Sequence, residues 1–385
     1  MVISKVESFI LKDQLSKSFY FSQWEYSERC ICVVKITTRS GEVGWGEGYG
    51  PAHVLNEGIN LLRPIVIGEN PLENELVWSK MYRKTLDYAR RGVLVASISA
   101  IDIALWDLKG KILGLPVSTL LGGKQRDHVR PYATGLYFSD INNPSRDYEE
   151  EIEDYIARGF KSIKMKVGLG VETDYQNVKK VRELIGDKIQ LMVDSNHAYN
   201  LREAVSLAKK LEPLNIHWFE EPLSPEYYEQ YNELRNRTTI PIAAGECEYL
   251  RFGFHQLLKN KSIDILQPDI CSSGGITEGK RIAALASTYG IEIVPHTWGT
   301  GIGIHVALNF IANLECIPGR MMQPDFLMEY DQTENGIRER LTYPKIELKD
   351  GLIAIPKAPG LGIEVDEAVL MEYAIPNETI KNITI

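Results

Sequence analysis

The sequence has few cysteines, no excess of positive charge and no long apolar run, and each absence excludes a class of protein. Five cysteines among 385 residues form no Cys-x-x-Cys pair, which argues against a disulfide framework. Lysine and arginine number 43 against 52 acidic residues, a net charge of −9, so no nucleic-acid or membrane partner is expected. The sequence contains no run of about 18 apolar residues, so no transmembrane helix is expected.

The start of the chain also lacks the long apolar segment of a secretory signal. We therefore expect a cytoplasmic protein with free thiols. Cys247 and Cys271 follow predicted strand ends and are interpreted as walls of a site. Apolar residues make up 44% and charged residues 25%, as in ordinary soluble proteins. The length predicts two domains.

The first part of the chain predicts an antiparallel sheet. Residues 2–12 and 30–38 alternate apolar and polar side chains, and residues 40–42 read as a hairpin turn. Between the two strands, residues 17–28 are rich in aromatic side chains. We interpret them as a loop that closes over another element.

Four glycines between Gly44 and Gly50 resemble a phosphate loop, but no Lys-Ser/Thr follows them and no helix opens there. We expect a strand end leading into a second flexible loop, 48–57, which contains His53. From residue 57 to about 121 the pattern is helical, with a long helix over 96–111 that stops at Gly114-Leu115-Pro116.

From residue 129 the chain alternates short apolar strands with helices, starting with a strand over 129–135 and a helix over 148–158. Titratable side chains follow successive apolar runs at intervals of about 25 residues, close to the length of one βα unit. In a βα barrel all strand ends open on one face, where the active site lies, so these side chains should converge. They are Lys166, Asp194, Glu220, Glu246, Asp269 and His296.

Asp194, Glu220 and Glu246, the carboxylate trio, end three consecutive strands in this interpretation. Three anions in one cavity repel each other unless a cation lies between them. An oxygen-only ligand set with open positions predicts Mg²⁺, with Mn²⁺ as a possible substitute. Salt-bridged barrel residues are the alternative.

Lys164 and Lys166 are two residues apart on one predicted strand, so both point into the barrel mouth. We expect the two ammonium groups to lower the pKa of one lysine toward that of a base. His296 and Asp269 end adjacent strands, and the aspartate should fix the imidazole tautomer. A base on each side of a metal-bound carboxylate favours abstraction of the α proton through an enediolate.

These motifs make the sequence similar to the enolase superfamily, mandelate racemase subgroup. Glu329, in Met328-Glu329-Tyr330-Asp331, matches the family's acid at the eighth strand, which hydrogen-bonds the intermediate. The resemblance implies a modified TIM barrel, (β/α)7β, over 126–350. It also implies an α+β capping domain over 1–125 with substrate-specificity loops at 17–28 and 48–57, and a segment over 351–385 that returns to it.

Further segments resemble D-galactarolactone cycloisomerases and related acid-sugar dehydratases. This likeness implies an acid-sugar or lactone substrate and a homo-oligomer, from dimer to octamer. The segments that carry it are residues 44–47, 101–107, 264–269 and 295–301.

Several other residues are weaker candidates for substrate contacts. Asn196 faces the same way as Asp194, and Trp298 follows the predicted catalytic histidine. Trp24 and His53, with Tyr88 and Arg90, could reach a substrate from the capping domain. Glu221 alternates away from Glu220 and is interpreted as a barrel-wall ion pair. The remaining histidines are interpreted as structural: His128, His197, His217, His255 and His305.

Two reactions use the same residues, and the sequence leaves both open. One is Mg²⁺-dependent β-elimination on an acid sugar or its lactone, by a dehydratase or a cycloisomerase. The other is racemisation or epimerisation, in which the opposite base returns the proton. A non-catalytic binding protein on the same fold is a third reading, which the complete set of titratable groups disfavours.

Overall fold

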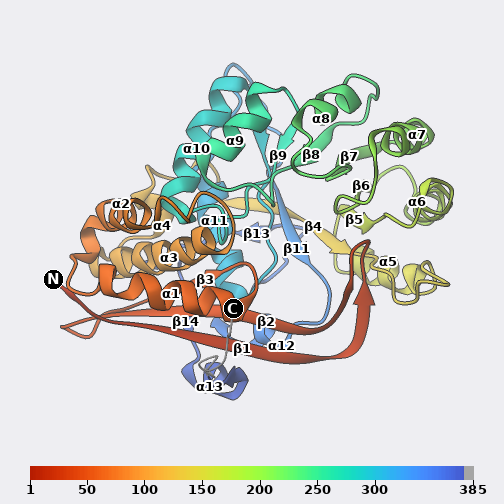
Figure 1. Cartoon of the computed structure of the whole chain (residues 1–385). Helices are drawn as coiled ribbons and strands as arrows, with labels where there is room; N and C mark the ends of the chain where they lie inside the picture. Colours follow the sequence, from red (N-terminus) through yellow and green to blue (C-terminus); the bar gives the residue numbers. More distant parts are fainter. Residues whose placement is uncertain (377–385) are drawn as a thin grey trace, which may run out of the picture.

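The computed structural model describes residues 1–376 of the chain. Figure 1 shows an N-terminal cap of sheet and helices beside a barrel of strands with helices around it. The predicted fold class, a modified TIM barrel with an α+β capping domain, is confirmed. Within residues 1–376, no helix combines the length and the apolar character needed to cross a membrane.

The cap sheet is antiparallel and has the order β15-β1-β2-β3. Its main strands are β1 (Ile3–Tyr20), β2 (Glu25–Thr38) and β3 (Val43–Gly48). The loop predicted over 17–28 is therefore wrong: only residues 21–24, the hairpin tip, lie outside the strands. Pairing of Phe19 with Tyr26 extends the two strands, because aromatic side chains suit a pleated surface.

Helices α1 (Ala52–Val66) and α3 (Val93–Leu113) cover this sheet, and α2 (Asn74–Thr85) packs on these two helices. The second loop, predicted over 48–57, is wrong from Ala52 onward, because α1 starts there and buries Leu55 and Ile59 on one face. The helix predicted over 96–111 is confirmed within α3. It ends at Gly114, whose φ of 67° is left-handed, as helix C-termini favour.

The glycines of β3 allow α3 to approach the sheet closely. A Cβ atom at Gly44 would lie 2.2 Å from the carbonyl oxygen of Ala104, and one at Gly46 would lie 2.1 Å from that of Ala100. The glycine run therefore serves helix–sheet packing. The strand end predicted at this glycine run is confirmed as β3.

Eight parallel strands form the barrel in the order β10-β9-β8-β7-β6-β5-β4-β11. Within residues 1–376, seven helices alternate with them. The strands are β4 (His128–Gly135), β5 (Ser162–Lys166), β6 (Gln190–Asp194), β7 (Ile216–Glu220), β8 (Ile242–Ala244), β9 (Ile265–Leu266), β10 (Glu292–Ile293) and β11 (Leu327–Asp331). The helices are α5 (Tyr148–Ala157), α6 (Val171–Ile185), α7 (Leu201–Leu211), α8 (Tyr228–Arg235), α9 (Leu250–Lys259), α10 (Gly275–Tyr289) and α11 (Gly301–Asn313).

The chain after the barrel returns to the cap, where β15 pairs antiparallel with β1. The last residues of the predicted C-terminal segment, 377–385, lie outside the described part of the chain. The shorter elements are η1 (Pro71–Glu73), α4 (Val117–Leu120), η2 (Glu212–Leu214), α12 (Gly336–Arg340), β12 (Thr342–Tyr343), β13 (Ile353–Ala354), β14 (Glu364–Val365), α13 (Glu367–Tyr373) and β15 (Ala374–Ile375).

Candidate active site

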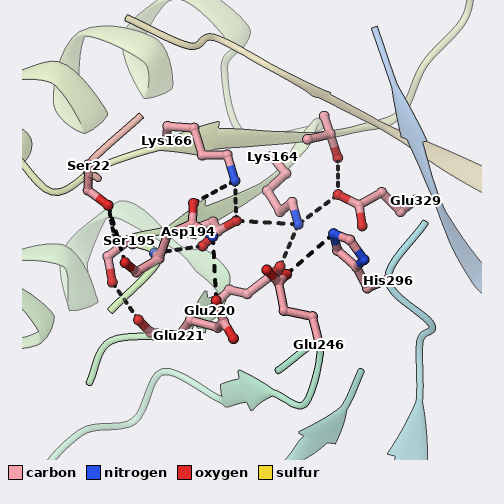
Figure 2. A network of polar contacts seen from close by, with 12 residues as sticks. Ser22, Lys164, Lys166, Asp194, Ser195, Glu220, Glu221, Glu246, His296 and Glu329 are labelled. Carbon is pink, nitrogen blue, oxygen red and sulfur yellow. Dashed lines mark hydrogen bonds and ion pairs between the residues drawn. The ribbon is translucent and has the colours of Figure 1, made fainter. Parts of the chain in front are cut away.

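The carboxylate trio lies at the carboxyl ends of three neighbouring strands. In the strand register Lys166 is opposite Asp194, and Asp194 is opposite Glu220. Glu246 follows the last residue of β8, Ala244, by two positions. One ligand oxygen from each member of the trio lies within 4.8 Å of the other two. Figure 2 shows the three side chains converging between Lys166 and His296.

The trio has the chemistry of a site for a hard divalent cation. Its ligand atoms are all carboxylate oxygens, the donors that Mg²⁺ prefers. Asp194 and Glu220 are fully buried, so their charges repel strongly. Burial, together with the charges of Asp194 and Glu329 and against that of Lys164, raises the pKa of Glu220 to about 7. A bound cation would relieve this repulsion, so the residues present fit Mg²⁺.

Both lysines point into this cluster, as expected. Lys164 Nζ contacts Glu220, lies 2.8 Å from Glu329 Oε1 and lies 3.6 Å from Asp194 Oδ2. Lys166 Nζ lies 2.5 Å from Asp194 Oδ2 and donates to Asn196 Oδ1 at 2.8 Å.

The expected lowering of a lysine pKa is wrong for this arrangement. Burial lowers the pKa of Lys164, but the charges of Glu220 and Glu329 outweigh it and hold the pKa well above the usual value. The pKa of Lys166 is raised in the same way by Asp194, against burial. Lys164 does lower the pKa of Lys166, but the carboxylates that face the two lysines have the larger effect.

His296 and Asp269 form the predicted dyad. His296 Nδ1 lies 2.6 Å from Asp269 Oδ2, and Nε2 lies 3.4 Å from Glu246 Oε2. The backbone N–H of Cys271 donates to Asp269 Oδ1 at 2.7 Å and orients the carboxylate. Burial lowers the pKa of His296, but the charge of Glu246, with those of Glu329 and Asp269, raises it to about 10.

Glu329 lies on β11 beside Lys164. Its Oε1 accepts from Thr134 Oγ1 at 2.7 Å, and its Oε2 accepts from the backbone N–H of Thr297 at 3.1 Å. Burial raises its pKa, but the charges of Lys164 and His296 lower it to about 2. Glu329 is therefore ionised and holds the ammonium group of Lys164 in place.

The hairpin tip from the cap lies on the strand ends of the barrel. Ser22 Oγ donates to the carbonyl oxygen of Ser195 at 2.8 Å, and Gln23 Nε2 donates to that of Asn196 at 2.8 Å. Lys166 Nζ lies 5.9 Å from the centroid of the Phe21 ring. The tip thus covers the site, where Lys166 and His296 are each only 7% exposed.

Trp298 belongs to an aromatic cluster under the hairpin. Its ring centroid lies 5.9 Å from that of Tyr26 and 5.7 Å from that of Tyr137. The Tyr137 ring in turn lies 5.2 Å from Lys166 Nζ. Trp298 therefore lines the wall beside the lysine, whereas Trp24 packs on Phe21 and is 55% exposed.

The structure does not bring the remaining cap candidates to the trio. His53 is exposed on the first turn of α1, and Tyr88 and Arg90 are exposed beyond α2. Tyr49, which precedes α1, reaches the site instead. Its ring centroid lies 5.1 Å from that of His296, and its N–H donates to the carbonyl of Cys271 at 3.1 Å.

Two residues that support Glu220 were missed by the sequence analysis. Trp218 Nε1 and Gln267 Nε2 donate to Glu220 Oε2 at 2.8 and 2.7 Å. Each lies two positions before a predicted site residue, Glu220 or Asp269, so strand alternation could have placed both on the inner face. No sequence pattern pointed to Tyr49 or Tyr137.

Glu221 has a polar partner in the barrel wall, and that partner is a histidine that we had expected to have only a structural role. His197 Nε2 lies 3.1 Å from Glu221 Oε2 and 3.5 Å from Cys247 Sγ. His305 Nδ1, in contrast, contacts the carbonyl oxygen of Gly301 at 2.7 Å within its own helix.

Comparisons with known proteins agree with this geometry. Residues 5–122 match the mandelate racemase / muconate lactonizing enzyme N-terminal domain, and residues 147–369 match the enolase C-terminal domain-like family. The chain belongs to the enolase superfamily.

Its similarity to several superfamily members extends over nearly the whole chain. It is 48% identical to the 3,6-anhydro-D-galactonate cycloisomerase from Zobellia galactanivorans, with a TM-score of 0.89 and 98% and 100% of the two chains covered. It is 39% identical to the D-galactarolactone cycloisomerase of Agrobacterium fabrum, with 98% and 100% covered. An L-talarate/galactarate dehydratase solved with Mg and L-glucarate is 27% identical, with a TM-score of 0.85 and 97% and 92% covered.

Proposed function

We propose that this enzyme is a cycloisomerase that opens the ring of a cyclic acid sugar by β-elimination. The observation that carries the proposal is the pair Lys166 and His296, which contact Asp194 and Glu246 from opposite sides. They do so in a chain that is similar over nearly its full length to two cycloisomerases.

The carboxylate trio would hold Mg²⁺, or Mn²⁺ in its place. The bound ion would neutralise the substrate carboxylate and lower the energy of the enediolate. Lys164, positioned by Glu329 at 2.8 Å, would donate to a carboxylate oxygen. Because Glu329 is ionised, we assign it the positioning of Lys164 rather than donation to the substrate. Asn196 orients Lys166, and Trp298 bounds the sugar ring.

Against the effect of burial, the charges of Asp194 and Glu246 raise the pKa of Lys166. The charge of Glu246 also raises the pKa of His296 against burial, so both groups are protonated while the trio is uncompensated. Cation binding to the trio would offset these charges, so that one of the two groups could lose its proton and then remove the α proton, while the other protonates the leaving oxygen. In 3,6-anhydro-D-galactonate the ether oxygen is on C3, the carbon β to the carboxylate. Loss of the C2 proton and cleavage of the C3–O bond open the ring. The freed oxygen takes a proton, and the enol becomes a 2-keto-3-deoxy acid of unchanged mass. With a lactone, the ring carboxylate leaves in the same way.

Dehydration of an open-chain acid sugar is the second candidate, favoured by the similarity to the talarate/galactarate dehydratase. The same two bases would then expel a hydroxide as water. Epimerisation requires only that the opposite base return the proton.

We also propose that the protein is a homo-oligomer and that it works in a reducing cytoplasm. The five cysteines, which are all free, agree with a reducing compartment.

The proposal is tested with a panel of anhydro-aldonates, aldarolactones and open-chain aldonates and aldarates, with Mg²⁺ in D₂O. Keto-acid formation is measured with semicarbazide, and product mass by mass spectrometry. We expect a cyclic substrate to have the highest kcat/KM. Its keto-acid product should have the mass of the substrate, increased only by the replacement of hydrogen with deuterium from the solvent. Preference for an open-chain acid with loss of water would identify a dehydratase. Deuterium uptake without a keto acid would identify an epimerase.

A further inference from the structure

A second group of potential metal ligands lies at the strand ends that carry the trio. This second cluster consists of His197, Glu221 and Cys247, and one ligand atom from each lies within 4.8 Å of the others. They follow Asp194, Glu220 and Glu246 by three, one and one positions. The ends of β6, β7 and β8 thus carry two groups of potential metal ligands. The carboxylate trio offers only oxygen atoms, whereas the second cluster offers one nitrogen, one oxygen and one sulfur atom.

The spacing within the second cluster suits a tetrahedral ion. Zinc binds sulfur at about 2.3 Å and nitrogen or oxygen at about 2.0–2.2 Å, which places tetrahedral ligands about 3.3–3.6 Å apart. His197 Nε2 lies 3.5 Å from Cys247 Sγ and 3.1 Å from Glu221 Oε2. An ion could therefore contact all three atoms after only small side-chain movements.

The orientation of His197 gives a second reason. Its Nδ1 lies 3.2 Å from the carbonyl oxygen of Leu223, and a carbonyl only accepts, so Nδ1 carries a hydrogen. In the neutral ring Nε2 then has a lone pair directed at an oxygen of Glu221. Either a proton or a metal ion must therefore lie between these two atoms, which are 3.1 Å apart. Histidines that bind metals are anchored through the other ring nitrogen in this way.

We propose that His197, Glu221 and Cys247 form a second metal site, which takes a borderline transition ion such as Zn²⁺ or Co²⁺. Thiolate and imidazole ligands favour such ions over Mg²⁺, which prefers the trio. His197 and Cys247 are partly exposed, so an ion can reach them and a fourth position can hold water. The thiol proton passes to solvent when the ion binds.

The second cluster is linked to Lys166 through one side chain. Asn196 Nδ2 donates to Glu221 Oε2 at 3.4 Å, and Asn196 Oδ1 accepts from Lys166 at 2.8 Å. An ion on Glu221 competes for the oxygen that orients Asn196. We therefore expect Zn²⁺ to inhibit the Mg²⁺-saturated enzyme. This consequence rests on the proposed function, whereas metal binding does not.

Co²⁺ titration of the full chain in saturating Mg²⁺ tests the site without a substrate. Thiolate ligation of Co²⁺ gives a charge-transfer band in the near ultraviolet, and tetrahedral Co²⁺ absorbs in the visible far more strongly than octahedral Co²⁺. We expect both signals for the wild type, and for the control variants Cys30→Ser and His255→Gln. Zn²⁺ should abolish both signals.

The variants Cys247→Ser and His197→Gln identify the ligands. Loss of supporting residues around a metal typically weakens binding about 10- to 100-fold, so loss of a direct ligand should weaken Co²⁺ binding at least about 100-fold. Cys247→Ser should also lose the thiolate band. Circular dichroism and Mg²⁺ affinity show whether each variant is folded.

Three results would overturn the site. The first is the absence of a thiolate band in the wild type. It would mean that a proton on Glu221, whose pKa burial raises, and not an ion, lies between Glu221 and His197. The second is an unchanged band in Cys247→Ser, which would assign the band to another cysteine. The third is equal Co²⁺ affinity in wild type and His197→Gln.

Discussion

Lys166 and His296 contact the two outer members of the carboxylate trio from opposite sides. Lys166 Nζ lies 2.5 Å from Asp194 Oδ2, and His296 Nε2 lies 3.4 Å from Glu246 Oε2. Glu220 lies between these acids in the strand order and contacts Lys164. Figure 2 shows Lys166 and His296 on opposite sides of the trio, so a substrate carboxylate held above the trio would have one proton-transfer group on each side.

Removal of the metal should abolish turnover. EDTA should stop product formation, and Mg²⁺ should restore it, because the enediolate charge needs a cation. Mn²⁺ should substitute in part. The measurement is the rate on a confirmed substrate after dialysis, with metal content determined by mass spectrometry. Full activity in a verified metal-free sample contradicts the metal assignment.

Glu220→Gln should weaken Mg²⁺ binding at least about 100-fold, the upper end of the loss seen for supporting residues around a metal. The amide removes a charged metal ligand and one of the carboxylates that contact Lys164. Isothermal titration with Mg²⁺ measures the change. Glu226→Gln, at an exposed position, is the control and should bind as the wild type does. Equal affinities in the two variants would remove Glu220 from the site.

The hairpin tip should hold the cap closed over the strand ends of the barrel. Ser22→Ala with Gln23→Ala removes donors to Ser195 and Asn196, each worth about 1 kcal/mol. We expect a higher KM and faster hydrogen exchange across the tip, with exchange in the barrel strands unchanged. Hydrogen exchange followed by mass spectrometry measures this opening. Exchange at the tip equal to that of the wild type would show that these bonds do not hold it.

Asp102 should make stability depend on pH. It accepts from the N–H and hydroxyl of Thr277 at 2.9 and 2.6 Å, where the cap meets α10. Burial, only partly offset by these bonds, raises its pKa from 3.8 to about 7. The folded state therefore holds this proton more tightly than the unfolded state. Its contribution to stability is complete below about pH 4 and is lost as the pH rises to about 7.

Asp102→Asn cannot titrate, so it should gain stability relative to the wild type over that range, by about 1.4 kcal/mol per pH unit. Urea unfolding midpoints of both proteins from pH 4.5 to 8 measure this difference. A difference that does not change with pH would show that Asp102 does not contribute in this way.

Asp269→Asn should lower kcat by about 10²- to 10⁴-fold, because the amide can hold the imidazole in the wrong tautomer. Metal affinity should stay close to that of the wild type, since Asp269 is outside the trio. The pH profile of kcat should shift, which a loss of folding alone would not cause. Unchanged kcat and profile would show that the dyad does not tune His296.

The barrel and its titratable groups could be predicted from sequence because each group follows a strand in a repeating unit. The loops could not. Residues 17–20 and 25–28 form strand because β1 and β2 continue to the barrel, where Tyr20 bridges to Phe138, a contact that no local pattern encodes. The lysine pKa values depend on distances to Glu220 and Asp194. Tyr49 reaches His296 only because the cap docks on the barrel.

The most direct test of the central claim is α-proton exchange in D₂O by Lys166→Ala and His296→Asn on a confirmed substrate. Each variant should lose at least about 100-fold in turnover, the lower end of what a general acid or base contributes. One variant, lacking the abstracting base, should lose exchange as well, and the other should retain it. Near-wild-type turnover in both variants would contradict the account.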